Sequence, residues 1–168
     1  MIFATVGTQL PFDRLLLALD TWAALNRNVQ VVAQTGRTNA VYSHMRTYPQ
    51  MDQRQFAQTV AQARVVVAHA GMGTILTALE TGKPLILMPR RADLGEHRND
   101  HQTDTAAEMA SLSNVTVVED SQALCTALNR AMAMPPLQAG RGAAVAPPQL
   151  IEAVRSFIWA DQSLQARP

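Results

Sequence analysis

One stretch of the chain, residues 65–102, carries the pattern of a complete βαβ unit. Residues 65–68 form a short apolar run with the β-branched content of a buried strand. A glycine-rich turn follows at residues 69–74, and residues 75–81 predict a helix that ends before the next glycine. A second apolar run, residues 85–88, leads into a loop dense in charged side chains. Because open α/β sheets bind ligands beyond the carboxyl ends of their strands, we expect a functional site where the turn and the loop meet.

The alternation of strands and helices extends over the rest of residues 1–134. Further strands are expected at residues 2–6, 29–33, 45–48 and 115–118. Further helices are expected at residues 11–25, at 52–63 with Asp52 as the N-cap, at 99–109, and after Asp120 or Ser121. This alternation predicts an α/β fold in which a parallel sheet is covered on both faces. The expected fold is a single Rossmann-like domain with about six parallel strands.

The composition is that of one ordinary globular domain. The chain has 168 residues and is 48% hydrophobic, which is enough for a sizeable core. Its 14 basic and 13 acidic residues nearly balance, so no overall charge favours nucleic acid. The single cysteine excludes an internal disulfide, and no apolar run reaches the roughly 20 residues that a membrane-spanning helix needs. We therefore expect a cytoplasmic location.

The C-terminal part departs from this pattern. Residues 135–148 are rich in proline, glycine and alanine, which is typical of a linker. Residues 149–168 predict a C-terminal helix, ending near Trp159, and a short tail. Such a helix is expected to dock either on its own domain or on a partner.

The turn that contains Gly71 and Gly73 is not a dinucleotide-binding fingerprint. That motif needs a third glycine where this chain has Leu76, and no Walker lysine follows the turn. Two interpretations remain open. The free N–H groups and the dipole at the start of the following helix suit phosphate oxygens. Alternatively, the glycines only provide a tight turn that needs a positive φ.

His69 lies between the strand and this turn. It is a candidate general base, or simply a hydrogen-bonded residue at a strand end. His97 and His101 are its candidate partners in a metal site, and their spacing of four places them on one face if both lie on a helix. Neither a cysteine ligand nor an HExxH pattern accompanies them, so we expect no metal site.

The charged loop after the second strand of the unit has two interpretations. Its place beyond the carboxyl end of a strand favours binding, and the alternative is a solvated surface loop. Arg90 and Arg91 are candidates for bidentate hydrogen bonds to phosphate. Glu96, Asp100 and Gln102 are candidates for hydrogen bonds to sugar hydroxyls.

Four segments of the chain match a known family in order and spacing. They are Phe3-Ala4-Thr5-Val6-Gly7-Thr8 with Pro11-Phe12-Asp13-Arg14-Leu15, then His69-Ala70-Gly71-Met72-Gly73-Thr74, then Gly82-Lys83-Pro84, and His97-Arg98-Asn99-Asp100-His101-Gln102. With these motifs the chain resembles the C-terminal, nucleotide-sugar-binding half of GT-B glycosyltransferases of family 28, the group that includes MurG. It looks most like the small separate subunits of split enzymes, of the Alg13 and PssE types.

The resemblance implies a donor site for a UDP-sugar. It assigns the diphosphate to the first loop and the glycine turn, with Gly7, Thr8, Gln9, His69, Ala70, Gly71, Met72, Gly73 and Thr74. It assigns the donor sugar to Asp100, His101 and Gln102, and Arg90, Arg91 and His97 complete the expected donor-binding set. Many relatives place an acidic residue for the ribose hydroxyls where this chain has Thr77. Either Glu80, one turn later, substitutes for it, or the ribose is bound differently.

The resemblance also implies a partner, because a GT-B enzyme needs two Rossmann-like domains and this chain has room for one. The partner is expected to be a membrane-anchored, acceptor-binding subunit of the Alg14 or PssD type that carries the catalytic base. The expected reaction is inverting transfer to a lipid-linked saccharide in exopolysaccharide biosynthesis, without a cofactor or bound metal, at the inner face of the membrane. The alternatives are a homodimeric enzyme similar to a nucleotide-sugar epimerase, and a non-catalytic nucleotide-binding assembly module.

Overall fold

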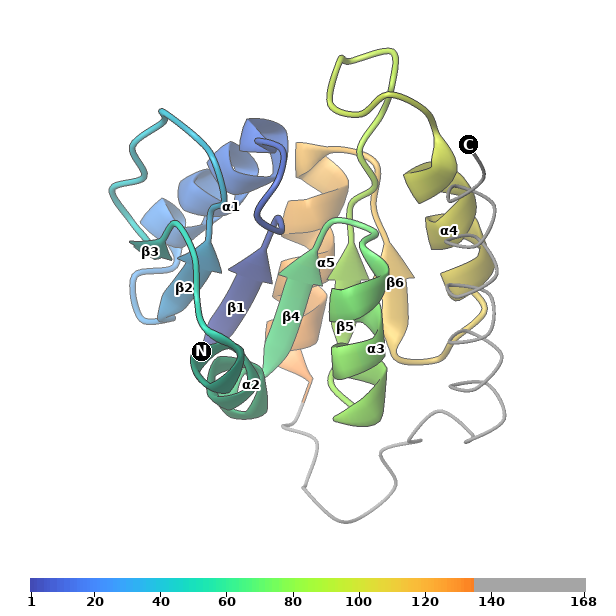
Figure 1. Ribbon diagram of the computed structural model, residues 1–168. Coiled ribbons are helices and arrows are strands. Elements are labelled where there is room, and N and C mark those ends of the chain that lie inside the picture. The colour runs from blue at the N-terminus through green and yellow to red at the C-terminus, as the bar shows by residue number, and fades with distance from the viewer. Residues whose placement is uncertain (135–168) are drawn as a thin grey trace.

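The computed structural model describes residues 1–134, which form a three-layer α/β fold (Figure 1). The strands are β1 (Ile2–Thr5), β2 (Val31–Gln34), β3 (Arg46–Tyr48), β4 (Val65–Ala68), β5 (Leu85–Leu87) and β6 (Val115–Val117). The helices are α1 (Asp13–Leu25), α2 (Gln53–Gln62), α3 (Met72–Glu80), α4 (His101–Met109) and α5 (Ser121–Ala133). The linker expected at 135–148 and the helix and tail expected at 149–168 lie outside the described residues.

All the strands of the sheet run parallel, in the order β3-β2-β1-β4-β5-β6. β1 lies in the centre, paired with β2 on one side and with β4 on the other. The chain therefore builds one half of the sheet outward from β1 and then returns to build the other half from β4. The boundary between β1 and β4 is a topological switch point, and the carboxyl ends of the strands face upward in Figure 1. The prediction of a Rossmann-like domain with about six parallel strands is confirmed.

Helices cover both faces of the sheet, and each face has its own hydrophobic core. Ile2 and Ala4 of β1 belong to the core that α1 and α5 cover. Phe3, between them in sequence, belongs to the core under α2, α3 and α4. The residues of β1, β2, β4 and β5 are all buried because helices cover both faces of these four strands, whereas the edge strands β3 and β6 are partly exposed. This double burial explains why these strands are continuous apolar runs rather than alternating ones.

The helix ends follow from local sequence. Asp52 and Asp120 cap α2 and α5, because their side chains accept hydrogen bonds from the backbone N–H groups of Gln55 and Ala123. α3 ends just before Gly82, which has a φ of +62°. Its N–H donates to Leu79 O, and the next N–H donates to Ala78 O, the paired bonds of a Schellman motif. The predicted caps and the predicted stop at Gly82 are therefore confirmed.

Most expected boundaries differ from the structure by one or two residues, and two of the differences affect the candidate site. α3 begins at Met72, not at residue 75, so that Gly73 and Thr74 belong to its first turn rather than to the preceding loop. α4 begins at His101, and His97 lies in the loop ahead of it. His97 and His101 therefore do not share a helix face, contrary to what their spacing suggests. None of the helices within residues 1–134 is both long and apolar enough to cross a membrane.

Candidate functional site

The candidate site lies at the switch point, where the loop after β1 and the turn after β4 meet. His69 joins them, because it directly follows β4 and its backbone N–H donates to Thr5 O at 3.4 Å. Its ring Nδ1 lies 3.4 Å from the same oxygen. The ring also lies against Gly7, where an added Cβ would be 3.1 Å from His69 Cε1. His69 therefore fills the space between the two loops.

Gly71 is required by its close approach to His69 and not by its backbone conformation. A Cβ on Gly71 would lie 2.3 Å from His69 Nε2 and 2.8 Å from Cε1. Gly71 has a φ of −90°, and the glycines with positive φ in the described part of the chain are Gly7, Gly36, Gly82 and Gly95. The interpretation of Gly71-Met72-Gly73 as a turn that needs a left-handed glycine is therefore wrong. The left-handed glycine of the site is Gly7, in the opposite loop.

His69 is neutral at physiological pH in this environment. Burial and the nearby positive charge of Arg90 lower its pKa from 6.5 to about 4. A side chain with such a pKa is a weak general base near pH 7, so this environment does not favour proton abstraction by His69. The geometry instead gives the ring a supporting role between two loops.

The N-terminus of α3 differs from the N-termini of the other described helices. Asp52 and Asp120 cap α2 and α5, and Asp13 and Asp104 lie in the first turns of α1 and α4. α3 has neither device, since Gly71 supplies no capping side chain and the first turn holds no acidic residue. The positive end of the α3 dipole is therefore left without a negative partner from the described chain.

Space is available at the same point. An added Cβ on Gly73 would have no other atom within 4 Å, so the first turn of α3 is open on that side. Thr8 and Gln9, in the loop after β1, are also exposed. An anion at the start of α3 would meet backbone N–H groups and a favourable dipole, as at many phosphate sites.

The two candidate ribose ligands lie further along α3. Thr77 is partly exposed, and its hydroxyl donates to Gly73 O at 2.9 Å. Glu80 is exposed at the last residue of the helix. Thr77 therefore lies nearer than Glu80 to the first turn of α3, and the choice between them stays a prediction.

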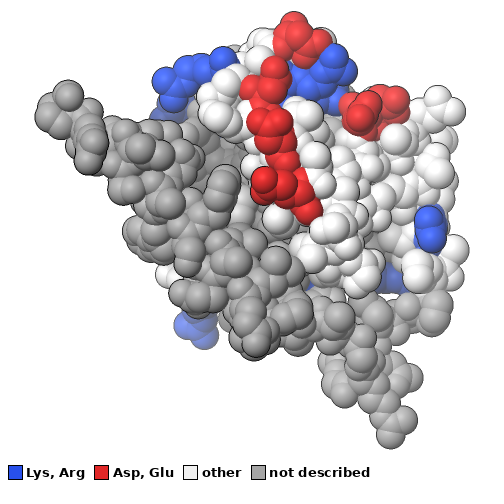
Figure 2. All heavy atoms as spheres, turned by 90° about the vertical axis from the view of Figure 1, so that its right-hand side faces the viewer, with Lys and Arg blue, Asp and Glu red and all other residues white. Residues whose placement is uncertain are grey.

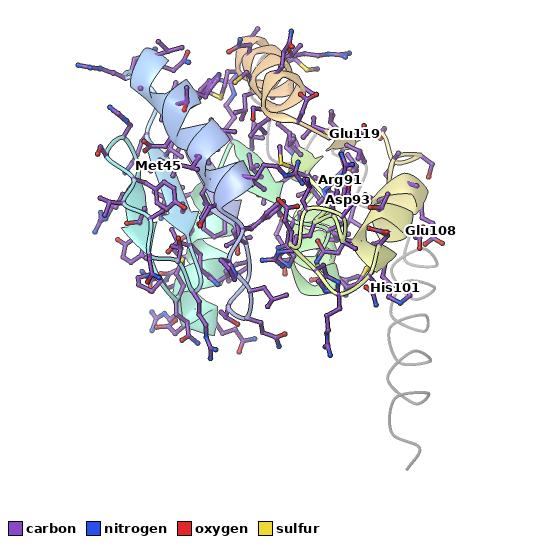
Figure 3. The ribbon with its side chains drawn as sticks, turned by 90° about the horizontal axis from the view of Figure 1, so that it is seen from above. Met45, Arg91, Asp93, His101, Glu108 and Glu119 are labelled. Atoms are coloured by element: carbon purple, nitrogen blue, oxygen red, sulfur yellow. The ribbon has the colours of Figure 1, made fainter. Side chains whose placement is uncertain are left out.

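The two arginines after β5 make different contacts. Arg90 is 4% exposed, and its Nη2 donates to Val6 O at 2.8 Å and to Leu10 O at 2.7 Å. It therefore holds the loop after β1 in place. Arg91 is exposed, and its guanidinium pairs with Asp93 at 2.6 Å (Figure 3). A contact of either arginine with phosphate stays a prediction.

Three predicted sugar ligands use side-chain oxygens to hold the backbone of the same loop. Gln102 Oε1 accepts from the N–H of residue 90 at 3.1 Å, and Glu96 Oε2 accepts from that of residue 91 at 3.0 Å. Asp100 Oδ1 accepts from the N–H of residue 92 at 3.0 Å. These residues therefore shape the loop between β5 and α4, whatever further hydrogen bonds they make to a ligand.

The two other candidate histidines differ in their relation to His69: His97, in the loop after β5, is near enough to add, after burial and Arg90, to the lowering of the His69 pKa. His97 Nδ1 lies 2.9 Å from Asn99 Oδ1, and His101 is exposed at the start of α4 (Figure 3). Within residues 1–134, no group of three or more His, Cys, Asp or Glu side chains is arranged to hold a metal ion.

The outer face of α4 is acidic. Figure 2 shows acidic side chains in a line across the side of the molecule on which α4 lies. Asp100, Asp104 and Glu108 are exposed and follow each other at intervals of four residues. This charge disfavours an anionic ligand on that face, so the start of α3 remains the favoured anion site.

Sequence reasoning missed that Arg14 supports the loop after β5. Arg14 lies in the first turn of α1, and its guanidinium forms a bidentate ion pair with Glu96, at 2.7 and 2.9 Å. The two residues are 82 positions apart in the chain, so no local pattern indicates the contact. The only signal was the place of Arg14 in one of the matching segments.

Comparisons with known proteins agree with this geometry. The fold is the Rossmann-like half of GT-B glycosyltransferases. The solution structure of ALG13 matches with a TM-score of 0.61 and 18% identity, over 94% of this chain and 96% of that one. The crystal structure of MurG from Acinetobacter baumannii matches with a TM-score of 0.55 and 15% identity, over 92% of this chain and 49% of that one.

The sequence places the chain in a family. The model of the glycosyltransferase family 28 C-terminal domain matches residues 1–152, and the chain belongs to this family. A curated relative from Prochlorococcus marinus subsp. pastoris is 27% identical over 97 residues, 57% of this chain. It is named UDP-N-acetylglucosamine--N-acetylmuramyl-(pentapeptide) pyrophosphoryl-undecaprenol N-acetylglucosamine transferase. The matched region is 26% of that relative's length.

Proposed function

We propose that the chain is the donor-binding subunit of an inverting GT-B glycosyltransferase that uses a UDP-sugar. The N-terminus of α3 carries this proposal, because it is the one described helix start without an acidic partner, and it lies at the switch point. A diphosphate bound there supplies the negative charge that stabilises the positive end of the α3 dipole. The membership of family 28 supports a glycosyl donor as the source of that diphosphate.

The proposed donor lies across the two loops that His69 joins. Gly7, Thr8 and Gln9 face the diphosphate from the loop after β1, and residues 70–74 face it from the start of α3. Asp100, His101 and Gln102 contact the sugar, by analogy with the family pattern. Glycosyl transfer then breaks the bond between the sugar and the diphosphate, and the helix dipole and backbone N–H groups stabilise the charge that develops on the departing UDP. No metal or cofactor is required in this scheme.

The acceptor is proposed to bind to a second subunit. The matched ALG13 structure is covered over 96% of its length, which supports a donor-binding subunit of that type. The proposed partner is membrane-anchored, of the Alg14 or PssD type, and supplies the acceptor site and the base that takes the acceptor proton. The acceptor is a lipid-linked saccharide of a polysaccharide or exopolysaccharide pathway, so the complex acts at the cytoplasmic face of the membrane.

Two substitutions at one residue test the donor site. Gly73→Asp is expected to leave the fold intact, since space is available and an acidic residue suits the first turn of a helix. It should weaken UDP binding at least about 100-fold, because like charges brought together cost several kcal/mol. Isothermal titration calorimetry with UDP measures the loss.

Gly73→Ala is the matched control, because it adds one methyl group at the same open position without a charge. We expect it to keep UDP binding within a few-fold. UDP affinity that is unchanged in Gly73→Asp, in a protein with a normal circular dichroism spectrum, would show that the diphosphate does not bind here. A transfer assay with and without the co-expressed membrane partner then tests the two-subunit arrangement, which activity of the chain alone would contradict.

A further inference from the structure

The segment Phe12-Asp13-Arg14 has no part in the proposed donor site, although it belongs to one of the segments that match the family. The structure shows that it connects several loops of the carboxyl edge. Asp13 Oδ1 accepts from Thr38 Oγ1 at 2.6 Å and from the Tyr42 hydroxyl at 2.8 Å, in the loop between β2 and β3. Phe12 is buried, and its ring lies about equally far from the guanidinium carbons of Arg14 and Arg90, at 5.2 and 5.1 Å.

Arg14 makes the most extensive of these connections. Besides its bidentate pair with Glu96, its Nη2 donates to Pro89 O at 2.9 Å and its Nη1 donates to Glu119 O at 2.6 Å. The partners lie in the loop after β5 and in the loop after β6. One side chain of α1 therefore holds two loops of the other half of the sheet.

The pair with Glu96 extends the connection to the start of α4. Glu96 Oε2 accepts from the N–H of Arg91, and the neighbouring N–H groups of residues 90 and 92 donate to Gln102 and Asp100. Gly95, with a φ of +70°, turns the chain so that Glu96 can reach back. The orientation of Gln102 and Asp100 thus depends on a loop that Arg14 also supports, through Pro89 O and Glu96.

We propose that Arg14 and Glu96 are positioning residues for the sugar-binding side of the donor site. They act through the loop 89–96 on Asp100 and Gln102, and they do not touch the donor. The four hydrogen bonds of the Arg14 guanidinium to Glu96, Pro89 and Glu119 occupy it within the fold, which leaves it poorly suited to phosphate. This inference rests on the proposed function, because it assigns the loop to the sugar of a UDP-sugar.

The test compares the affinity for UDP-sugar with the affinity for UDP. The probes are UDP, UDP-glucose, UDP-galactose, UDP-N-acetylglucosamine and UDP-glucuronate, and the sugar that binds most tightly to the wild type is used. Arg14→Gln and Glu96→Gln are expected to lower the affinity for that UDP-sugar, relative to UDP, by about tenfold, since misplaced binding groups lose most of their effect. The affinity for UDP itself should change less than threefold.

Lys83→Met is the control, because Lys83 supports α2 at the opposite edge of the sheet. It should destabilise the chain without changing the ratio of the two affinities. A wild-type ratio in Arg14→Gln and Glu96→Gln, or an equal loss of UDP and UDP-sugar, would overturn the inference. A wild type that binds no UDP would instead overturn the proposed function.

Hydrogen exchange provides a readout that needs no nucleotide. The amides of residues 90–92 are held by Gln102, Glu96 and Asp100, so they should exchange at least about tenfold faster in Arg14→Gln than in the wild type, as expected for a locally opened loop. In Lys83→Met, exchange of these amides should not speed up by more than the loss of global stability explains. Unchanged exchange at 90–92 in Arg14→Gln would show that the connection does not position the loop.

Discussion

The two edges of the sheet use the same kinds of side chain for different purposes. At the amino edge, Lys83 Nζ donates to Ala61 O and Ala63 O at 2.7 and 2.9 Å, where α2 ends. Arg64 Nη2 donates to carbonyls at the end of α5, Met132 O among them at 2.8 Å. At the carboxyl edge, Arg14 and Arg90 donate to carbonyls of loops instead.

This difference follows from the direction of the chain. Helices that connect parallel strands end at the amino edge, so their negative ends gather there, and the basic side chains of Lys83 and Arg64 bind those of α2 and α5. The positive helix ends gather at the carboxyl edge. Four of them receive an aspartate, and α3 receives none from the described chain. At the amino edge, two negative helix ends therefore have basic partners within the chain, whereas at the carboxyl edge the positive end of α3 has no acidic partner from the described residues.

The largest expected effect comes from His69, the half-buried histidine of the carboxyl edge. The unfolded chain takes up a proton near pH 6.5 and the folded chain only near pH 4, so the unfolded state binds more protons between these values. The free energy of unfolding should have its full value above pH 6.5 and should fall by up to about 3 kcal/mol as the pH drops toward 4. Urea unfolding of the wild type and of His69→Gln between pH 4 and 7 measures this. Identical pH profiles for the two proteins would contradict the assignment.

A smaller effect is expected from Gly71→Ala. Its Cβ would lie 2.3 Å from His69 Nε2, and such overpacking in this half-buried site should lower the free energy of unfolding by about 2 kcal/mol. UDP affinity should fall with it, because the ring separates the two loops of the site. Gly73→Ala, which meets open space within a helix, should instead stabilise the chain by up to about 1 kcal/mol.

The reason for the Gly71→Ala effect can be checked directly. In the double variant His69→Ala with Gly71→Ala the clash no longer exists, so the two changes should be clearly non-additive in urea unfolding. Additive losses would mean that Gly71 is needed for another reason than its contact with the ring.

The smallest effect is expected from Lys83→Met, which tests whether the amino edge of the sheet is independent of the donor site at the carboxyl edge. Lys83→Met removes two hydrogen bonds from the end of α2 and should cost about 1 to 2 kcal/mol in urea unfolding. UDP affinity should stay within twofold, because the change lies at the amino edge of the sheet, opposite the proposed donor site. Arg27→Met, which removes a single exposed bond of 3.3 Å, is the control and should be nearly neutral. A loss of UDP binding in Lys83→Met would break the proposed separation of the two edges.

Much of the fold could be predicted because the signals for it are local. Short apolar runs, capping aspartates and the glycine after α3 each act within a few residues, and their elements occur in the structure. The start of α3 was placed three residues too late, because Gly73 is a poor helix former and its propensity argued against a helix that includes it. The residues 135–168 stay at the level of prediction.

The site was predicted less completely than the fold. The sequence indicated which segments gather at the carboxyl edge, since parallel strands bring their carboxyl ends together. It did not indicate that Arg90 faces inward to Val6 O and Leu10 O, or that Glu96 and Gln102 hold the backbone of their own loop. These contacts join different loops and elements, and spacing within one segment carries no record of them.

The sequence by itself determined the class of fold, the glycine turn at the switch point and the family likeness that accompanies it. Only the tertiary structure decided why Gly71 must be a glycine, which helix start lacks an acidic partner, and that Arg14 connects α1 with the loops after β5 and β6. The physical reason is the range of the interactions. Hydrophobic periodicity and capping act along the chain, whereas steric contact, desolvation and guanidinium hydrogen bonds act across space.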